Sequence, residues 1–117
     1  MRQITSCFVV FVLALPAMAQ EAIKIQKPFR ASSLSGIVVD RTGSEIPGVL
    51  VERLSLDENS AQEGIVTDPK GLFIFPQITQ GKHSLKLTKP GWSTMYIRVV
   101  IDKKAKGKLE VEMSIAR

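Results

Sequence analysis

Short apolar runs separated by turn residues make up the chain from residue 36 onward. Seven such runs, rich in β-branched and aromatic residues, recur at roughly the 8–12-residue spacing typical of an antiparallel sandwich or barrel. They are approximately 36–40, 49–56, 64–67, 72–76, 82–89, 95–101 and 109–115. The only stretch that tolerates a helix, residues 57–63, is short and polar, so we predict an all-β fold.

The last two runs have the clearest pattern. Every second residue of 95–101 and of 109–115 is apolar, as a strand with one buried face requires, because successive side chains point to opposite faces. The polar link between them, residues 102–108, contains a glycine. We predict that the two runs form a hairpin in which Arg98 faces Glu112 across the outer surface.

Two segments of the chain resemble each other in sequence. They are Gly-Ile-Val-Val-Asp-Arg-Thr-Gly at 36–43 and Gly-Ile-Val-Thr-Asp-Pro-Lys-Gly at 64–71. In each, a strand is predicted to enter a tight turn. The first residue of the turn, Asp40 or Asp68, bonds the backbone ahead of it, and the fourth, Gly43 or Gly71, tolerates a positive φ. Neither turn has the alternating oxygen ligands of a calcium site, so we expect no metal there.

Residues 1–19 have the three parts of a secretory signal peptide. Arg2 supplies a positive charge, an apolar run extends from Cys7 to Leu15, and small residues precede a cleavage site after Ala19. The apolar run is about half the length of the roughly 20 residues that a membrane-spanning helix needs. We therefore predict that the segment is cleaved and that the protein is exported, either to the periplasm or out of the cell. Loss of Cys7 leaves the exported chain without a disulfide.

Composition and charge are consistent with one exported domain. The chain has 117 residues, 44% of them hydrophobic and 23% charged, which excludes a collagenous or wholly disordered protein. Its net charge of +5 falls to +4 when Arg2 is removed. Export argues against nucleic acid as the partner of this basic chain. Residues 20–33 are polar and basic, and we predict that they form an extended lead-in.

Three motifs in the chain resemble those of carboxypeptidase regulatory-like domains. The first spans residues 36–51 and includes Ile-Pro-Gly, the second is Thr-Asp-Pro-Lys-Gly-Leu-Phe-Ile-Phe at 67–75, and the third runs from Gly81 to the pair Gly91-Trp92. The resemblance implies a seven-stranded, antiparallel, transthyretin-like Greek-key sandwich over residues 34–117. It also implies a non-catalytic module, usually an accessory to exported peptidases, TonB-dependent receptors or surface proteins.

The residue types themselves argue against catalysis. A zinc peptidase needs several His or carboxylate ligands around an open coordination position, whereas this chain has one histidine, His83. Because His83 shares its parity with Leu85 and Leu87, we predict that it belongs to an inward-facing row. The chain also has no Gly-x-Ser-x-Gly elbow and no glycine-rich phosphate loop. We predict no enzymatic activity, no bound metal and no cofactor.

Two groups of surface residues are candidates for binding. Trp92, Tyr96 and Arg98 form a shallow platform for a sugar if Trp92 keeps the parity of the strand that follows it. The link at 102–108 is either a solvated loop or an electrostatic contact with an anionic envelope polymer or an acidic partner. Its four cations are Lys103, Lys104, Lys106 and Lys108.

Two functions remain open at this point. The first is an adapter that docks on a partner protein in the envelope or outside, through an edge strand or the basic segment 22–33. The second is a free-standing carbohydrate-binding module for an envelope or environmental glycan. Few aromatics are available for a sugar, while an open sandwich always has unpaired edges, so the sequence favours the adapter. An appendage that supports the folding of a partner is compatible with the first function.

Overall fold

The computed structural model describes residues 22–25, 27–106 and 108–116, and this part of the chain contains nine strands and no helix. The strands are β1 (Ile23–Lys24), β2 (Phe29–Ala31), β3 (Leu34–Val39), β4 (Leu50–Leu54), β5 (Ala61–Val66), β6 (Leu72–Phe75), β7 (Gly81–Thr88), β8 (Met95–Ile101) and β9 (Leu109–Glu112). The predicted signal peptide, residues 1–19, lies outside the described residues. In the described part no helix is long and apolar enough to cross a membrane.

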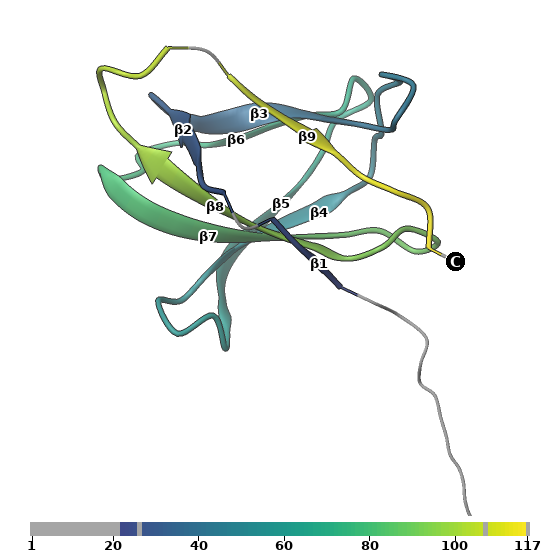
Figure 1. Cartoon of the computed structure of the whole chain (residues 1–117), viewed down its shortest axis with the longest axis horizontal. Helices are drawn as coiled ribbons and strands as arrows, with labels where there is room; N and C mark the ends of the chain where they lie inside the picture. Colours follow the sequence, from purple (N-terminus) through teal and green to yellow (C-terminus); the bar gives the residue numbers. More distant parts are fainter. Residues whose placement is uncertain (1–21, 26, 107, 117) are drawn as a thin grey trace, which may run out of the picture.

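The strands form two sheets that face each other (Figure 1). The larger sheet has the order β1-β8-β7-β4-β5, with β2 also paired to β8, and the smaller one has the order β6-β3-β9. Each of the seven predicted runs overlaps one strand, β3 to β9. The predicted total of seven is not confirmed, because the lead-in contributes two more strands, β1 and β2.

The lead-in is extended, as predicted, but it is part of the larger sheet. β1 and β2 pair in parallel with β8, in the registers Ile23↔Met95 and Ala31↔Ile101. Ala31 is completely buried, and Phe29 packs against the core. The apolar residues of this segment were too few and too irregularly spaced to predict a strand, since a partner edge rather than an internal pattern holds it.

The predicted hairpin between residues 95–101 and 109–115 is wrong. β8 and β9 lie in different layers: β9, drawn in yellow, pairs in parallel with β3 (Figure 1). A hairpin is excluded because β8 already has β7 on one edge and β1 and β2 on the other. Arg98 consequently aligns with Ser84 of β7, and Glu112 aligns with Val39 of β3.

Both sheets are mixed, which corrects the prediction of a purely antiparallel fold. The pairs β3–β6, β4–β5, β4–β7 and β7–β8 are antiparallel, whereas β1–β8, β2–β8 and β3–β9 are parallel. β8 and β9 lie in different sheets, so the chain crosses from one layer to the other between them, and β9 then pairs in parallel with β3.

The core lies between the inner faces of the two sheets. Every second residue of β8 is buried, as the alternation predicted, and so are Leu109 and Val111 of β9. The rings of Phe73 and Phe75 pack edge to face, with their centroids 6.4 Å apart. The largest fully buried side chains are Leu34, Val38, Val49, Val51, Leu85, Leu87, Ile97, Val99, Leu109, Val111 and Met113.

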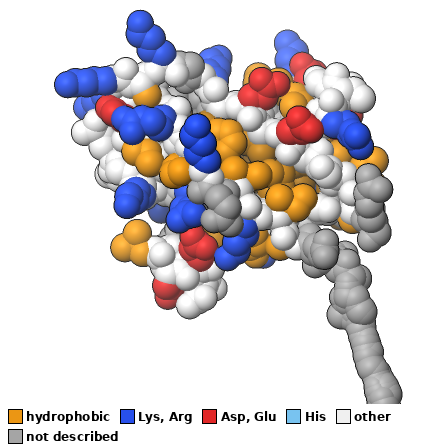
Figure 2. Space-filling view, viewed as in Figure 1, with side chains coloured by type: hydrophobic (Ala, Val, Ile, Leu, Met, Phe, Trp, Pro, Cys, Tyr) orange, Lys and Arg blue, Asp and Glu red, His pale blue; other side chains and the backbone are white. Residues whose placement is uncertain are grey.

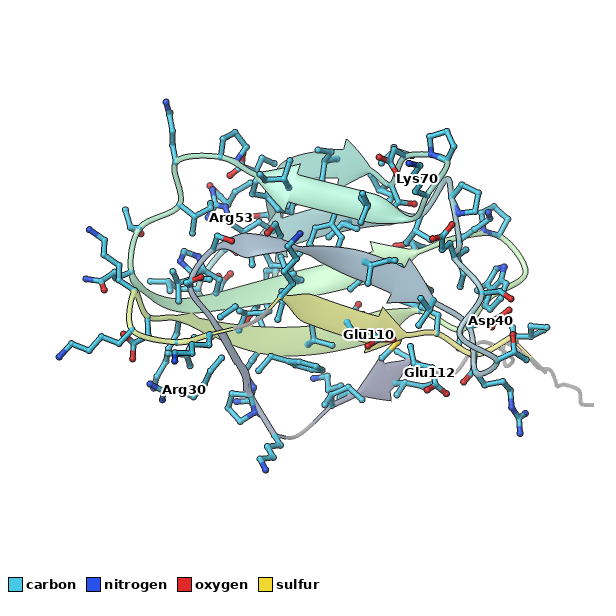
Figure 3. All side chains as sticks on the ribbon, turned by 90° about the horizontal axis from the view of Figure 1, so that it is seen from above. Arg30, Asp40, Arg53, Lys70, Glu110 and Glu112 are labelled. Carbon is cyan, nitrogen blue, oxygen red and sulfur yellow. The ribbon has the colours of Figure 1, made fainter. Side chains whose placement is uncertain are left out.

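The two similar segments form turns with the same hydrogen bonds. The carboxylate of Asp40 accepts hydrogen bonds from the backbone N–H groups of Thr42 and Ser44, and that of Asp68 accepts them from Lys70 and Leu72. The fourth residues, Gly43 and Gly71, have φ values of +88° and +78° and donate their N–H groups to the carbonyls of Asp40 and Asp68. Both turns lie at the same end of the sandwich (Figure 3).

Candidate binding surfaces

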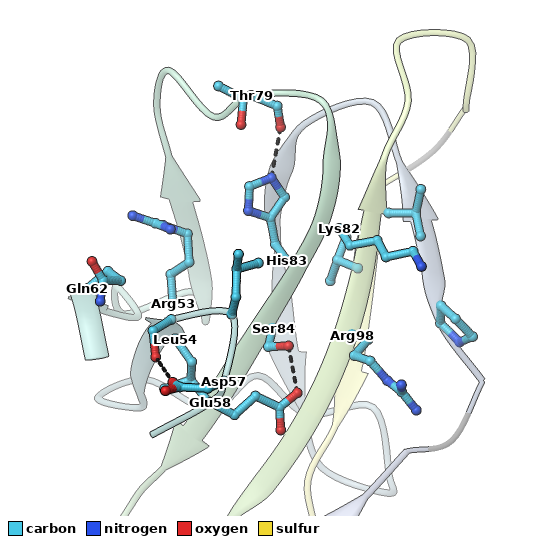
Figure 4. A pocket seen from close by; sticks show the side chains of 15 residues that line it. Arg53, Leu54, Asp57, Glu58, Gln62, Thr79, Lys82, His83, Ser84 and Arg98 are labelled. Atoms are coloured by element: carbon cyan, nitrogen blue, oxygen red, sulfur yellow. Dashed lines mark hydrogen bonds between the residues drawn. The ribbon is translucent and has the colours of Figure 1, made fainter. Parts of the chain in front are cut away.

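The histidine that the sequence singled out has a local structural contact. Nε2 of His83 lies 2.8 Å from the carbonyl oxygen of Thr79, and the ring is half-buried (Figure 4). Leu85 and Leu87, which share its parity, are fully buried. Among the residues that the structure describes, no three His, Cys, Asp or Glu side chains are grouped so that they could hold a metal ion.

The three residues of the predicted sugar platform do not form one surface. Trp92 precedes β8 in a turn closed by its N–H bond to the Lys89 carbonyl, and its side chain packs against the core. An isolated bridge to Ile115 holds its backbone. Trp92 therefore does not keep the parity of β8. Tyr96 and Arg98 do lie on the same outer face of that strand, and both line one hollow.

Tyr96 has cationic neighbours on both sides across the sheet. Lys24 of β1 and Lys86 of β7 align with it in register. Their Nζ atoms lie 5.7 Å and 5.9 Å from the centroid of its ring, which is the range of a cation–π interaction. The sequence could not reveal this group, because the three residues are distant along the chain.

The four lysines of the link 102–108 are exposed, as a solvated loop or an electrostatic contact requires. Asp102 organises the start of the loop: it accepts the N–H groups of Lys104 at its carboxylate and of Ala105 at its carbonyl. The Asp102 carboxylate also pairs with Arg30 of β2 at 2.6 Å. Lys and Arg side chains gather on the left half of the face in Figure 2, from this loop down to the β4–β5 hairpin.

The hairpin tip at 55–60 is fixed by its acidic residues. Asp57 accepts hydrogen bonds from the Ser55 hydroxyl and the Asn59 N–H, and these bonds hold the pKa of its carboxyl below the usual value, with the hydroxyl contributing most. The neighbouring Glu58 accepts a hydrogen bond of 2.9 Å from the hydroxyl of Ser84 on β7 (Figure 4). The tip is thereby tied to the outer face of the larger sheet.

Two adjoining hollows lie between this tip and β7 and β8. They have volumes of about 870 Å³ and 240 Å³ and share Glu58, Ser84 and Arg98 in their linings. Together we call them the face groove. Sequence reasoning missed this groove, because its wall is a hairpin that folds back over a sheet.

Another hollow lies between β5 and β6, which are edge strands of different sheets. It has a volume of about 410 Å³, and we call it the edge groove. Val66, Leu72 and Ile74 line it and are 57%, 42% and 57% exposed. The other lining residues are Ser35, Gly36, Ile65, Asp68, Phe73 and Lys108.

Comparison with known protein families gives one match. Residues 33–114 match the model of the carboxypeptidase regulatory-like domain. The chain belongs to this family. The matched range of the carboxypeptidase regulatory-like domain includes β3 to β9 and both turns, whereas β1 and β2 lie before it. No curated protein matches the chain.

Proposed function

We propose that this protein is a non-catalytic, exported adapter that binds a partner protein in the cell envelope or outside the cell. The observation that supports this proposal is the apolar edge groove between two unpaired strand edges. We also propose that β3 to β9 keep the transthyretin-like Greek-key order that the family resemblance implies.

The edge groove has both features that an extended segment of a partner needs. In the described part of the chain, β5 pairs only with β4, and β6 pairs only with β3, so each strand leaves one edge of N–H and C=O groups without a strand partner. An added strand is held by such backbone groups, while alternate side chains enter pockets beside them. Val66 and Ile74 provide apolar contacts on the two sides of the groove.

The exposure of these side chains is difficult to explain by folding alone. The tip of the β4–β5 hairpin carries a single exposed leucine, Leu56, in the lining of the face groove, whereas the edge groove concentrates several exposed apolar side chains in one hollow. Grouped apolar surface of this kind usually marks an interaction site, while single exposed apolar residues are normal.

The alternative, a carbohydrate-binding module that stacks a sugar on aromatic rings, has less support. Trp92 packs against the core, and the ring of Tyr96 has two lysine ammonium groups within 6 Å of its centroid. For the adapter itself, we favour docking at the edge groove over docking through the basic lead-in, because β1 and β2 already pair with β8.

The proposal predicts that a charge in the edge groove weakens partner binding. Full burial of an Ile side chain contributes about 1.5–3 kcal/mol, so the 57% of Ile74 that is exposed can contribute roughly 1–1.5 kcal/mol on docking. Ile74→Asp removes this term and places a carboxylate in the interface, so binding should weaken by about tenfold or more. The measurement is retention of the partner from the native envelope fraction, followed by titration of the purified partner.

Leu56→Asp is the matched control, because Leu56 is 98% exposed and lies on the hairpin tip. We expect this variant to bind the partner with unchanged affinity. Equal retention by both variants, or equal loss in both, contradicts docking at the edge groove.

A further inference from the structure

The face groove has an excess of cationic side chains. Lys24, Lys82 and Arg98 line it together with Arg53, which pairs with Glu63 at 2.8 Å. The acidic residues of the lining are Asp57 and Glu58, and both already accept hydrogen bonds from protein groups. Among the described residues, no salt bridge joins Lys24 or Lys82 to an acidic residue of the groove lining. The floor of the groove along β7 and β8 therefore presents positive charge to a ligand.

The lysine pair around Tyr96 strengthens this charge at one point. The Nζ atoms of Lys24 and Lys86 are both within 6 Å of the same ring centroid, and Lys86 also aligns with Glu52 on β4. Two like charges that share one ring repel each other, and an anion placed beside both removes that repulsion. Attraction to the ring favours this placement of the two ammonium groups before a ligand arrives, which lowers the entropic cost of binding.

Neutral hydrogen-bonding groups line the same groove. The side chains of Ser55, Gln62, Thr79 and Ser84 contribute to the larger hollow, next to the cationic ones. Anionic groups need the cations, whereas hydroxyl groups of a sugar need partners of this neutral kind. The hairpin tip lies beside the floor (Figure 4), which favours a narrow chain over a flat bilayer surface.

From these observations we propose that the face groove binds a linear acidic polysaccharide, with its anionic groups beside Lys24, which lines the groove, and Lys86, which shares the ring of Tyr96 with it. This site is separate from the edge groove, because the two grooves share no lining residue. The protein then holds a polymer in one groove and its protein partner in the other.

The test is binding of polygalacturonate to the purified protein at low ionic strength, measured by calorimetry. The double variant Lys24→Gln, Lys86→Gln should bind about tenfold more weakly. The matched control Lys103→Gln, Lys106→Gln removes the same charge from the exposed loop and should change the affinity by less than about twofold. Thermal melts of both variants establish that each is folded.

Other ligands test the stated chemistry of the site. Neutral dextran, poly-glutamate and anionic lipid vesicles should bind weakly, and without dependence on Lys24 and Lys86. Equal losses in the two double variants would overturn the proposal in favour of non-specific charge attraction. Binding of dextran, of poly-glutamate or of vesicles that depends on Lys24 and Lys86 would overturn it in favour of a neutral glycan, an acidic protein or a membrane. Ile74→Asp should bind polygalacturonate normally, so failure of this proposal and failure of the adapter proposal are distinguishable.

Discussion

The two similar turns allow the steric cost of one methyl group to be measured against an internal reference. Gly43 and Gly71 have nearly the same φ and the same hydrogen bonds. A Cβ atom added at Gly43 meets nothing within 4 Å, whereas one added at Gly71 lies 2.8 Å from the carbonyl oxygen of Val38 and 3.2 Å from the N atom of Ile46. Substitution by Ala therefore strains both turns equally but creates a clash only at Gly71.

The magnitude follows from these two contributions. A left-handed conformation costs an Ala roughly 1–2 kcal/mol. The smaller conformational freedom of Ala in the unfolded chain stabilises the folded state by about 0.4–1 kcal/mol, so Gly43→Ala should destabilise the fold by about 1 kcal/mol. The backbone clash at Gly71 adds about 1–3 kcal/mol, as overpacking does elsewhere. For a domain of this size each 1 kcal/mol lowers the melting temperature by about 4–8 °C.

Thermal and urea unfolding of the two variants, followed by circular dichroism, checks this difference. The conformational strain and the change in the unfolded state are common to both substitutions, so they cancel when the two variants are compared. We expect Gly71→Ala to be the less stable by about 2 kcal/mol. Equal stability of the two variants would refute the close approach of the second turn to β3.

Two further predictions concern a charge and a buried residue. The hydrogen bond from the Thr42 hydroxyl is the main cause that keeps the pKa of Asp40 below its usual value, and backbone N–H groups add to it. The ionised Asp40 carboxylate therefore stabilises the fold at neutral pH, and this stabilisation is lost as the pH falls below about 4. Asp40→Asn should therefore be less stable at pH 7 and should lose less stability on acidification, as denaturant titrations at several pH values will measure. Ala31→Asp should destabilise the fold by several kcal/mol because Ala31 is fully buried in β2, whereas Ser32→Asp, at the exposed neighbour, should change stability by less than about 0.5 kcal/mol in the same assay.

Local patterns in the sequence predicted those parts of the fold that local physics decides. The alternation of Met95, Ile97 and Val99 with polar residues identified a strand with one buried face, and the spacing of Asp40 and Gly43 identified a tight turn. Such features depend on residues a few positions apart. They therefore need no knowledge of which strand is the neighbour.

Strand pairing could not be predicted in the same way. The alternation in 109–115 shows that one face is buried, but it is equally compatible with pairing to β8 or to β3. The choice depends on β1 and β2 occupying the free edge of β8, and their sequence has too weak a pattern to reveal a strand.

For the candidate sites, too, the sequence predicted what local patterns decide and missed what depends on strand pairing. Tyr96 and Arg98 could be placed on one face from parity alone, but the position of Trp92 depends on a turn that breaks the parity. The lysines around Tyr96 are contributed by neighbouring strands, so the group becomes visible only once the register is known. The edge groove likewise requires two strands from different sheets.

The adapter proposal is tested most directly by photo-crosslinking in the native cell. A photoreactive residue is placed at Ile74 in the edge groove and, in a second strain, at Leu56 on the hairpin tip. The proposal predicts one discrete protein adduct from position 74 and none from position 56, and the captured protein should bind Ile74→Asp about tenfold or more weakly than the purified wild-type chain. No adduct from position 74, or the same adducts from both positions, would contradict docking at the edge groove.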